Sequence, residues 1–361
     1  MQRSTLIIMG KRFLQIGLPM VILGFFTYYV VKDWKQLTAH PLHWNLWLLA
    51  LAFVGFMLQE LSYGLIWRAV LERLGSRIEL RTALRIYLAS EFVRYIPGNV
   101  WHVLTRILWV GKYGVSRPVA FASMMIELIT KLAAGAFVFA LSLLFWGSIG
   151  AVQSLLSSKL LIVGLGVLTI ILLLVVLHPR ILSGILNTAL RLLKRNPIEI
   201  TLRYSDILLV CLAWSVSWIV AGIAFYILVL AIWPTMPIAA LPICIGIYAI
   251  AWDIGFISFI TPSGLGFREG AIAGLFALSL PFLPLAWGPI IAVLSRFIST
   301  VAEIVCVSLA YLSGVQQVRA VQHEQDSLPS VPKNESESQE MNMPISEIST
   351  QSSVQGGAID E

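Results

Sequence analysis

Charged residues are scarce in this chain. Asp, Glu, Lys and Arg make up 12% of the 361 residues, whereas hydrophobic residues make up 58%. A soluble domain has no core large enough to bury so high an apolar fraction, so a soluble fold is excluded. Several uncharged runs come close to the ~20 residues that a bilayer helix needs, namely Phe13 to Val31, Gln36 to Gln59, Leu132 to Ser158 and Leu160 to Leu177. The sequence therefore predicts an integral membrane protein with several crossings.

Residue patterns for metal or nucleotide binding are also missing. The three cysteines, Cys211, Cys244 and Cys306, lie in apolar segments without a CxxC spacing, and the five histidines form no HExxH or similar pattern. The sequence has no Gly-rich nucleotide loop. We therefore expect neither a metal nor a cofactor, and we expect no nucleic acid partner.

Prolines divide the longest uncharged run. Residues Ile207 to Trp252 contain no charge, but Pro234, Pro237 and Pro242 divide the run into two crossings joined by a tight turn. Three more prolines divide the later apolar stretch, Pro281, Pro284 and Pro289. The expected fold is an all-α polytopic membrane protein, a helical bundle of about seven to eight spans.

Two short motifs place Pro and Gly in apolar sequence beside charged residues. They are RYIPGNVWH at 94 to 102 and FITPSGLGFREG at 259 to 270. Pro removes a backbone donor and Gly adopts unusual backbone angles, so neither motif suits an uninterrupted helix. At membrane depth, a broken helix usually lines a cavity. The motifs begin 165 residues apart, which suggests an internal repeat.

The segments around both motifs are too short to cross a bilayer. Residues 83 to 96 and 98 to 110 would form helical arms of only about 20 Å, against a hydrocarbon core of ~30 Å. They predict either a re-entrant hairpin or an amphipathic pair at the membrane surface. After the second motif, residues 270 to 280 would form a helix of roughly 16 Å, which is a half-helix or a distorted crossing. The sequence therefore predicts two broken or re-entrant elements.

The breaks suit an anion. Pro97 and Pro262 could each open a helix whose first amides are exposed, and such amides attract phosphate or carboxylate. A nearby Arg would add charge-assisted hydrogen bonds. The candidates from the two motifs are Arg94, Pro97, Gly98, Asn99, His102, Arg106, Pro262, Ser263, Gly264, Gly266, Arg268 and Glu269. The alternative is that these arginines only reach toward the membrane interface.

Other charges within apolar segments need partners because their burial is costly. Glu127 and Lys131 are four residues apart, and Arg296 and Glu303 are seven apart, so each pair shares one helix face. Each pair either joins the substrate path or only holds helices together. Asp253 has no partner that can be read from the sequence, and it joins the candidate substrate-binding residues.

The basic loops predict an orientation. Arg-rich or Lys-containing connections at 68 to 81, 111 to 118 and 178 to 206 should face the cytoplasm, with the N-terminus on that side of an inner or plasma membrane. A crossing between 270 and 285 would place the C-terminus there too. The last 39 residues contain eight acidic residues and one Lys, which leaves the preceding body with a net charge of +13. We predict a membrane domain over 1 to 318 and a disordered acidic tail over 319 to 361.

The motifs RYIPGNVWHVLTR and TPSGLGFREG resemble the two signature regions of the lysylphosphatidylglycerol synthase transmembrane-region family. The resemblance covers about residues 10 to 318 and implies a helical bundle with paired re-entrant elements and a role in lipid handling. It places the family's Pro-Gly break at Pro97, Gly98 and Asn99, with Arg94 before it and Arg106 after it. Its second signature falls on Pro262, Gly264, Gly266, Arg268 and Glu269. Aminoacyl-transferring relatives carry a large soluble catalytic domain after the membrane region, whereas a disordered tail is expected here.

Two classes of function follow. A flippase-like protein would move an anionic or polyprenyl-linked lipid between leaflets, holding its headgroup at the broken helices. A membrane-embedded headgroup transferase would need a base near the motifs, such as His102, Glu127, Asp253 or Glu269. A third possibility is a non-catalytic membrane subunit that recruits a partner enzyme. Membrane lipids with anionic headgroups are the expected partners, and translocation is the preferred interpretation.

Overall fold

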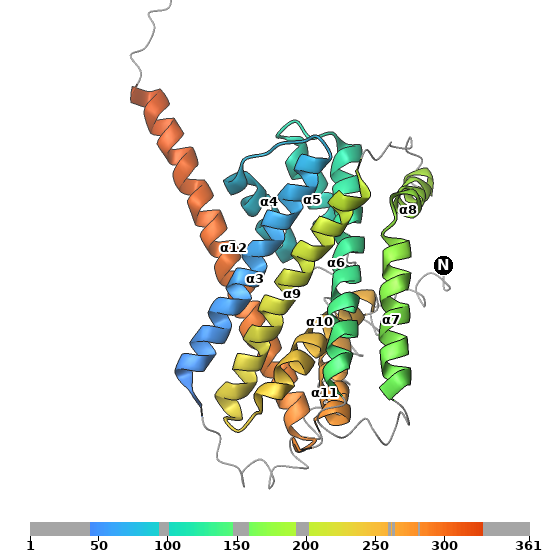
Figure 1. Cartoon of the computed structure of the whole chain (residues 1–361). Coiled ribbons are helices and arrows are strands. Elements are labelled where there is room, and N and C mark those ends of the chain that lie inside the picture. The colour runs from blue at the N-terminus through green and yellow to red at the C-terminus, as the bar shows by residue number, and fades with distance from the viewer. Residues whose placement is uncertain are drawn as a thin grey trace, which may run out of the picture. The chain divides into compact units, whose positions relative to one another are not determined.

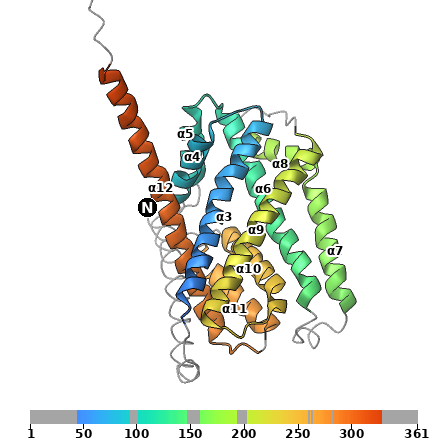
Figure 2. The ribbon, with the colours of Figure 1, turned by 60° about the vertical axis from the view of Figure 1, so that its left-hand side comes forward.

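Every regular element in the part of the chain that the structure describes is a helix. The computed structural model describes residues 44–93, 101–146, 159–192, 202–258, 261, 264–280 and 282–327. Its helices (Figures 1 and 2) are α3 (Leu46–Arg73), α4 (Leu80–Phe92), α5 (Trp101–Gly111), α6 (Arg117–Trp146), α7 (Lys159–Val176), α8 (Pro179–Leu192), α9 (Tyr204–Ile232), η3 (Ile238–Ala240), α10 (Leu241–Ile257), α11 (Phe267–Ser279) and α12 (Trp287–Ser327). The all-α prediction is confirmed.

Helices of membrane-spanning length and composition make up most of these residues. Five qualify, Leu46–Arg73, Arg117–Trp146, Tyr204–Ile232, Ile238–Ile257 and Trp287–Leu312, and a pair bent by 65°, Gly164–Val176 with Pro179–Thr188, could supply a sixth. The span predicted at 13 to 31 lies outside the described residues, as does the predicted tail beyond Ser327. Contacts divide the chain after Ser313, and the account below concerns the first unit.

Two predicted spans are displaced along the chain. The run from Gln36 to Gln59 suggested a helix there, but α3 begins at Leu46, where Asn45 Oδ1 accepts hydrogen bonds from the amides of Trp47 and Leu48. The helix then continues to Arg73, through residues assigned to a loop. Likewise α6 spans Arg117–Trp146, not 132 to 158. The charge-free runs predicted the wrong bounds because both helices also contain charged residues. Those residues face the interior of the protein or lie near the polar end of the bundle.

The first motif lies within a hairpin of two short helices. The helices α4 and α5 have 13 and 11 residues, or roughly 20 and 16 Å. They pack on each other and against α3 and α6. Tyr87 and Arg106 are buried within the protein, at 0% and 1% exposure. A pair lying on the membrane surface would not bury these side chains, so the re-entrant interpretation holds. The apex, residues 94–100, lies outside the described residues.

The second motif forms a hairpin of α10 and α11. The two helices pack against each other, and the turn between them contains Gly264 and Gly266 with φ of +65° and +87°. A Cβ at Gly264 would lie 2.3 Å from the carbonyl oxygen of Gly255, so the turn also needs Gly for space. With 13 residues, α11 measures about 20 Å and is too short for the crossing expected between 270 and 285.

The two hairpins open at opposite ends of the bundle. At one end the Asn45 amide donates to the carbonyl of Ala231, and the rings of Trp233 and Trp287 lie 5.3 Å apart, so α10 begins and α11 ends there. At the other end, where α4 begins and α5 ends, Arg73 Nε lies 3.7 Å from Asp206 Oδ1. Along the chain, the long helices α3 and α6 flank the α4–α5 hairpin, and α9 and α12 flank the α10–α11 hairpin. This arrangement is the one that an inverted repeat would produce.

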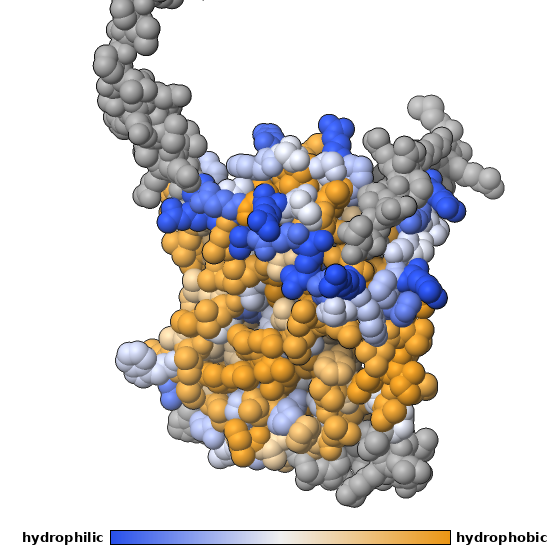
Figure 3. Space-filling view, turned by 45° about the horizontal axis from the view of Figure 1, so that its top comes forward, coloured by the Kyte–Doolittle hydropathy of each residue, from blue (hydrophilic) through white to orange (hydrophobic). Residues whose placement is uncertain are grey.

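Basic residues gather at the end where the α4–α5 hairpin opens. Figure 3 shows hydrophilic side chains across the upper part of the molecule and a broad apolar surface below them. The described parts of the three predicted basic connections, at 68–81, 111–118, 178–192 and 202–206, all adjoin this end, since they follow α3, α5 and α7 there. The structure thus brings together the loops that the charge pattern assigned to one side.

Candidate functional site

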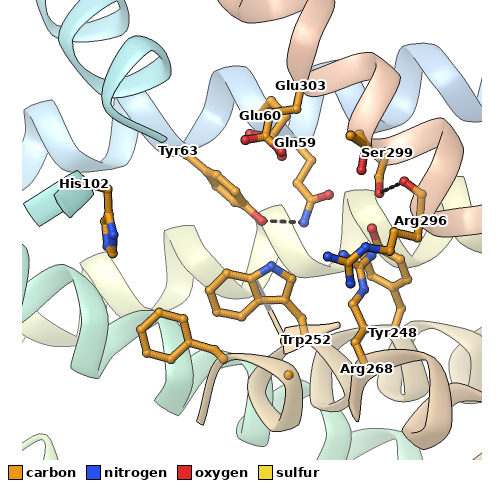
Figure 4. A pocket seen from close by; sticks show the side chains of 14 residues that line it. Gln59, Glu60, Tyr63, His102, Tyr248, Trp252, Arg268, Arg296, Ser299 and Glu303 are labelled. Atoms are coloured by element: carbon orange, nitrogen blue, oxygen red, sulfur yellow. Dashed lines mark hydrogen bonds between the residues drawn. The ribbon is translucent and has the colours of Figure 1, made fainter. Parts of the chain in front are cut away.

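A cavity lies between the two hairpins. It is lined by side chains from α3, α5, α10, α11 and α12, which meet near the inner ends of both hairpins. Figure 4 shows Arg268, Arg296 and Tyr248 together on one side of this cavity, and Glu60 and Glu303 together on another. The cavity therefore has a cationic and an acidic side, at a depth where charges are expensive and usually functional.

Arg268 has open hydrogen-bonding capacity in this cavity. It follows the first residue of α11, and its guanidinium carbon lies 4.8 Å from the centre of the Tyr248 ring. Its Nε and Nη2 atoms are buried and have no hydrogen-bond partner among the described residues. Buried donors without an acceptor are destabilising. An anionic group that entered the cavity would remove this cost and gain charge-assisted hydrogen bonds.

Arg296 on α12 has a different environment. Its Nη1 lies 2.6 Å from Glu269 Oε1 on α11, and the other carboxylate oxygen accepts a 2.6 Å hydrogen bond from the Gly266 amide. This ion pair joins two helices, whereas the sequence offered Glu303, on the same helix, as a partner of Arg296. Glu269 also caps the start of α11. The Gly266 amide is therefore already hydrogen-bonded, whereas the sequence predicted that the first amides of this helix would be exposed to a ligand.

Arg106 is buried in a network that holds the α4–α5 hairpin to α6. Its Nη1 lies 2.8 Å from Glu127 Oε2, its Nη2 donates to Glu91, and its Nε donates to Ser90 Oγ at 2.9 Å. The Tyr87 hydroxyl donates to the second Glu127 oxygen at 2.7 Å. The guanidinium carbon also lies 3.8 Å from the Tyr87 ring centre. All three nitrogens of this Arg are occupied, which suits a structural role.

Lys131 and Asp253 lie deeper, where α6 meets α10. The Lys131 ammonium lies over aromatic rings, 3.6 Å from the Tyr63 centroid, 4.1 Å from Trp252 and 5.0 Å from Trp214. Glu127, which the sequence suggested as its partner, gives its oxygens to Arg106 and Tyr87 instead. Asp253 is 3% exposed, and its Oδ1 is buried without a hydrogen-bond partner in the described part of the chain.

A second cavity adjoins the first. Glu91, Arg106, Glu127 and Lys131 help to line it, and His102 lines both cavities. Of the predicted site residues, the structure thus brings His102, Gly264, Arg268, Arg296 and Glu303 to the first cavity, and Arg106, Glu127 and Lys131 to the second. Six others, Arg94, Pro97, Gly98, Asn99, Pro262 and Ser263, lie outside the described residues.

The model of a known family, the lysylphosphatidylglycerol synthase TM region, matches residues 12–306. The chain belongs to this family. No curated protein was found to match the chain. The match covers both hairpins and every residue that lines the two cavities. Membership of the lysylphosphatidylglycerol synthase TM family makes this a multi-pass membrane protein of a lipid-related family.

Several residues of this family member's cavity gave no signal in the sequence. Tyr63, Tyr248 and Trp252 lie in apolar runs, where aromatic residues are common, and Gln59 is neutral. Their positions follow only from packing, since Gln59 Nε2 donates to Tyr63 Oη at 2.7 Å and the Tyr63 ring lies 5.2 Å from Trp214. A helical spacing of four joins Tyr248 to Trp252 and Gln59 to Tyr63, but that spacing also occurs in ordinary cores.

Proposed function

We propose that this protein moves lipids between the two leaflets and binds an anionic headgroup at Arg268. The observation that carries the proposal is a cation with buried, open donor atoms in a cavity between two hairpins that enter the bundle from opposite ends. Such a site is reached from either side by moving one hairpin at a time, which is the principle of alternating access. Membership of a lipid-related family supports a lipid as the substrate.

The chemistry of the cavity favours a phosphate. An Arg presents a planar fork that matches two phosphate oxygens, and the neighbouring Tyr248 ring holds one face of the guanidinium. Anionic phospholipids and polyprenyl-linked lipids share this group. The body of the chain, at +13, also suits anionic headgroups at the membrane surface.

A headgroup transferase fits the cavity less well. Two of the carboxylates that the sequence offered as bases are bound by arginines, Glu127 by Arg106 and Glu269 by Arg296. A carboxylate oxygen that already accepts a hydrogen bond from an arginine would have to leave that ion pair before it could take a proton from a substrate. We therefore place translocation ahead of transfer and ahead of a non-catalytic role in a lipid-modifying complex.

We also propose that the basic end of the bundle faces the cytoplasm of an inner or plasma membrane, because Lys and Arg are retained on that side. The N-terminus would then lie in the cytoplasm. The C-terminal tail would then lie in the cytoplasm too, because the last span, Trp287–Leu312, begins at the opposite end of the bundle.

The test is lipid movement in liposomes that contain the purified protein and a fluorescent phosphatidylglycerol. A membrane-impermeant quencher reports the leaflet of each probe, and chromatography reports whether the lipid changed chemically. We expect movement without conversion. Arg268→Gln should slow it about tenfold or more, since a charge-assisted contact contributes ~1.5 to 3 kcal/mol.

Arg203→Gln is the matched control, because this exposed Arg precedes α9 at the basic end and should tolerate the change. Equal rates in the Arg268 variant and the parent would show that Arg268 binds no headgroup. Chemical conversion of the lipid would support the transferase instead.

A further inference from the structure

Asp253 occupies an unusual place for a carboxylate. It lies in α10 within the bundle, and its side chain packs against Gly135 of α6. A Cβ on Gly135 would lie 2.3 Å from Asp253 Oδ2, so only Gly at this position leaves room for the carboxylate. The side chain is thus seated in a notch on α6 rather than turned toward either cavity.

This carboxylate has incomplete hydrogen bonding. Its Oδ1 is buried without a partner among the described residues, and the whole residue is 3% exposed. A buried ionised carboxylate with an unpaired oxygen costs several kcal/mol, and either a nearby cation or a bound proton removes that cost. Both remedies are open to Asp253, since a proton would bind at Oδ1 and a cation lies close by.

That cation is Lys131, which is one helical turn before Gly135 on α6 and whose ammonium contacts the ring of Trp252, the residue before Asp253. Its ammonium lies between two regions, because it lines the second cavity while the rings of Tyr63 and Trp252, which it contacts, line the first. A negative charge in either cavity would therefore compete with Asp253 for Lys131.

The other charges near α10 are already engaged or more distant. On α11, Arg268 stacks on Tyr248 and Glu269 is held by Arg296. On α6, Glu127 is bound by Arg106.

The remaining elements around α10 add little charge. The charged residue of α9 is Asp206, which lies in the first turn of that helix at the basic end. The short helix η3 contains no charged residue. On α3, Glu60 faces the first cavity near Tyr248. Lys131 and Asp253 thus form a local pair whose balance an incoming anion can change.

We propose that Asp253 binds a proton when an anionic headgroup enters, so that one lipid and one proton are carried together. The phosphate draws the charge of Lys131 toward the cavity, and the Asp253 carboxylate then takes a proton from water to form a neutral acid. When the headgroup leaves, the O–H bond breaks, the proton returns to water and the carboxylate regains Lys131. This coupling rests on the proposed lipid translocation and adds an energy source to it.

The coupling has a reciprocal consequence. If lipid binding favours proton binding, a fall in pH must raise the affinity for the lipid by the same factor. An acidic compartment would load the carrier and a neutral one would unload it. A pH difference across the membrane would then drive net movement of the lipid.

The test measures proton uptake directly. Purified protein in nanodiscs of phosphatidylcholine is held in weak buffer with a pH-sensitive dye, and short-chain phosphatidylglycerol is added while its binding is followed by a tracer. We expect the parent to take up about one proton, or slightly less, for each lipid that binds. Asp253→Asn should bind lipid but take up at least about fivefold fewer protons, because the amide cannot titrate.

Three further variants guard against a folding effect. Gly135→Ala should displace the carboxylate and reduce proton uptake, whereas Gly164→Ala on α7, where a Cβ meets nothing within 4 Å, should leave it unchanged. Glu72→Gln, a half-buried acid paired with Arg68 outside both cavities, should also behave like the parent.

The outcomes separate the two proposals. Lipid binding without proton uptake, or equal uptake by the parent and Asp253→Asn, would overturn the coupling and leave translocation intact. Absence of phosphatidylglycerol binding by the parent would overturn both. Uptake that is lost in Asp253→Asn and in Gly135→Ala, but kept in both controls, would establish the coupling.

Discussion

At the scale of single residues, three cations inside this bundle have three different surroundings. Arg106 is enclosed by two carboxylates and a hydroxyl, Lys131 lies among aromatic rings, and Arg268 retains buried donors without acceptors. The first arrangement suits structure and the third suits a ligand. The sequence singled out all three because charges in apolar segments are costly.

The sequence could not assign their partners. Only neighbours on one helix can be read from spacing, so Glu127 was matched with Lys131 and Arg296 with Glu303. Two ion pairs between helices could not be read in this way, Glu127 with Arg106, which joins α6 to α5, and Arg296 with Glu269, which joins α12 to α11. Such pairs depend on how the helices pack, which no local pattern specifies.

The contrast between Arg106 and Arg268 predicts opposite effects on stability. Arg106→Gln would leave the carboxylates of Glu91 and Glu127 buried without their counter-ion, and we expect a loss of about 3 to 5 kcal/mol. Arg268→Gln removes a charge with two buried donor atoms that lack acceptors, so stability should stay within about 1 kcal/mol or rise. Thermal unfolding in one detergent would compare the two, and equal losses would contradict the assigned roles.

At the scale of elements, the sequence found both breaks but not their geometry. Pro and Gly identified the motifs, and the length of the arms showed that they cannot cross a bilayer. The re-entrant and surface interpretations of 83 to 110 stayed open, because an amphipathic pattern is the same whether a helix faces protein or the membrane interface. The burial of Tyr87 and Arg106 decides between them.

The turn between α10 and α11 predicts a strict need for Gly264. Gly264→Ala would combine a strained φ of +65° with a Cβ only 2.3 Å from the Gly255 carbonyl oxygen. We expect a loss of at least about 1 to 3 kcal/mol and impaired lipid movement. Gly274→Ala in α11 is the control, since its Cβ meets nothing within 4 Å and Ala favours a helix by up to ~1 kcal/mol. Similar stability of both variants would show that the turn is loosely held.

At the scale of the whole molecule, the predicted membrane body and its orientation can be tested by labelling. The native cysteines are buried, so their background should be low. In otherwise native protein, Arg203→Cys at the basic end should react only from the cytoplasmic side. Ile238→Cys, 72% exposed at the opposite end, should react only from the other side. A membrane-impermeant maleimide on oriented vesicles measures this, and reversed labelling would invert the proposed topology.

The opposed hairpins also change where the membrane voltage falls. Because α4, α5 and α11 are each too short to cross the bilayer, water that enters the bundle beside the hairpins would leave only a thin insulating layer between their inner ends. The full transmembrane potential would then act over that short distance, at ~2.3 kcal/mol per elementary charge per 100 mV. A lipid anion that travels alone would carry its charge through this field, whereas one that travels with a proton would carry none. Lipid movement in liposomes should therefore respond to a potassium diffusion potential in Asp253→Asn and be nearly indifferent to it in the parent.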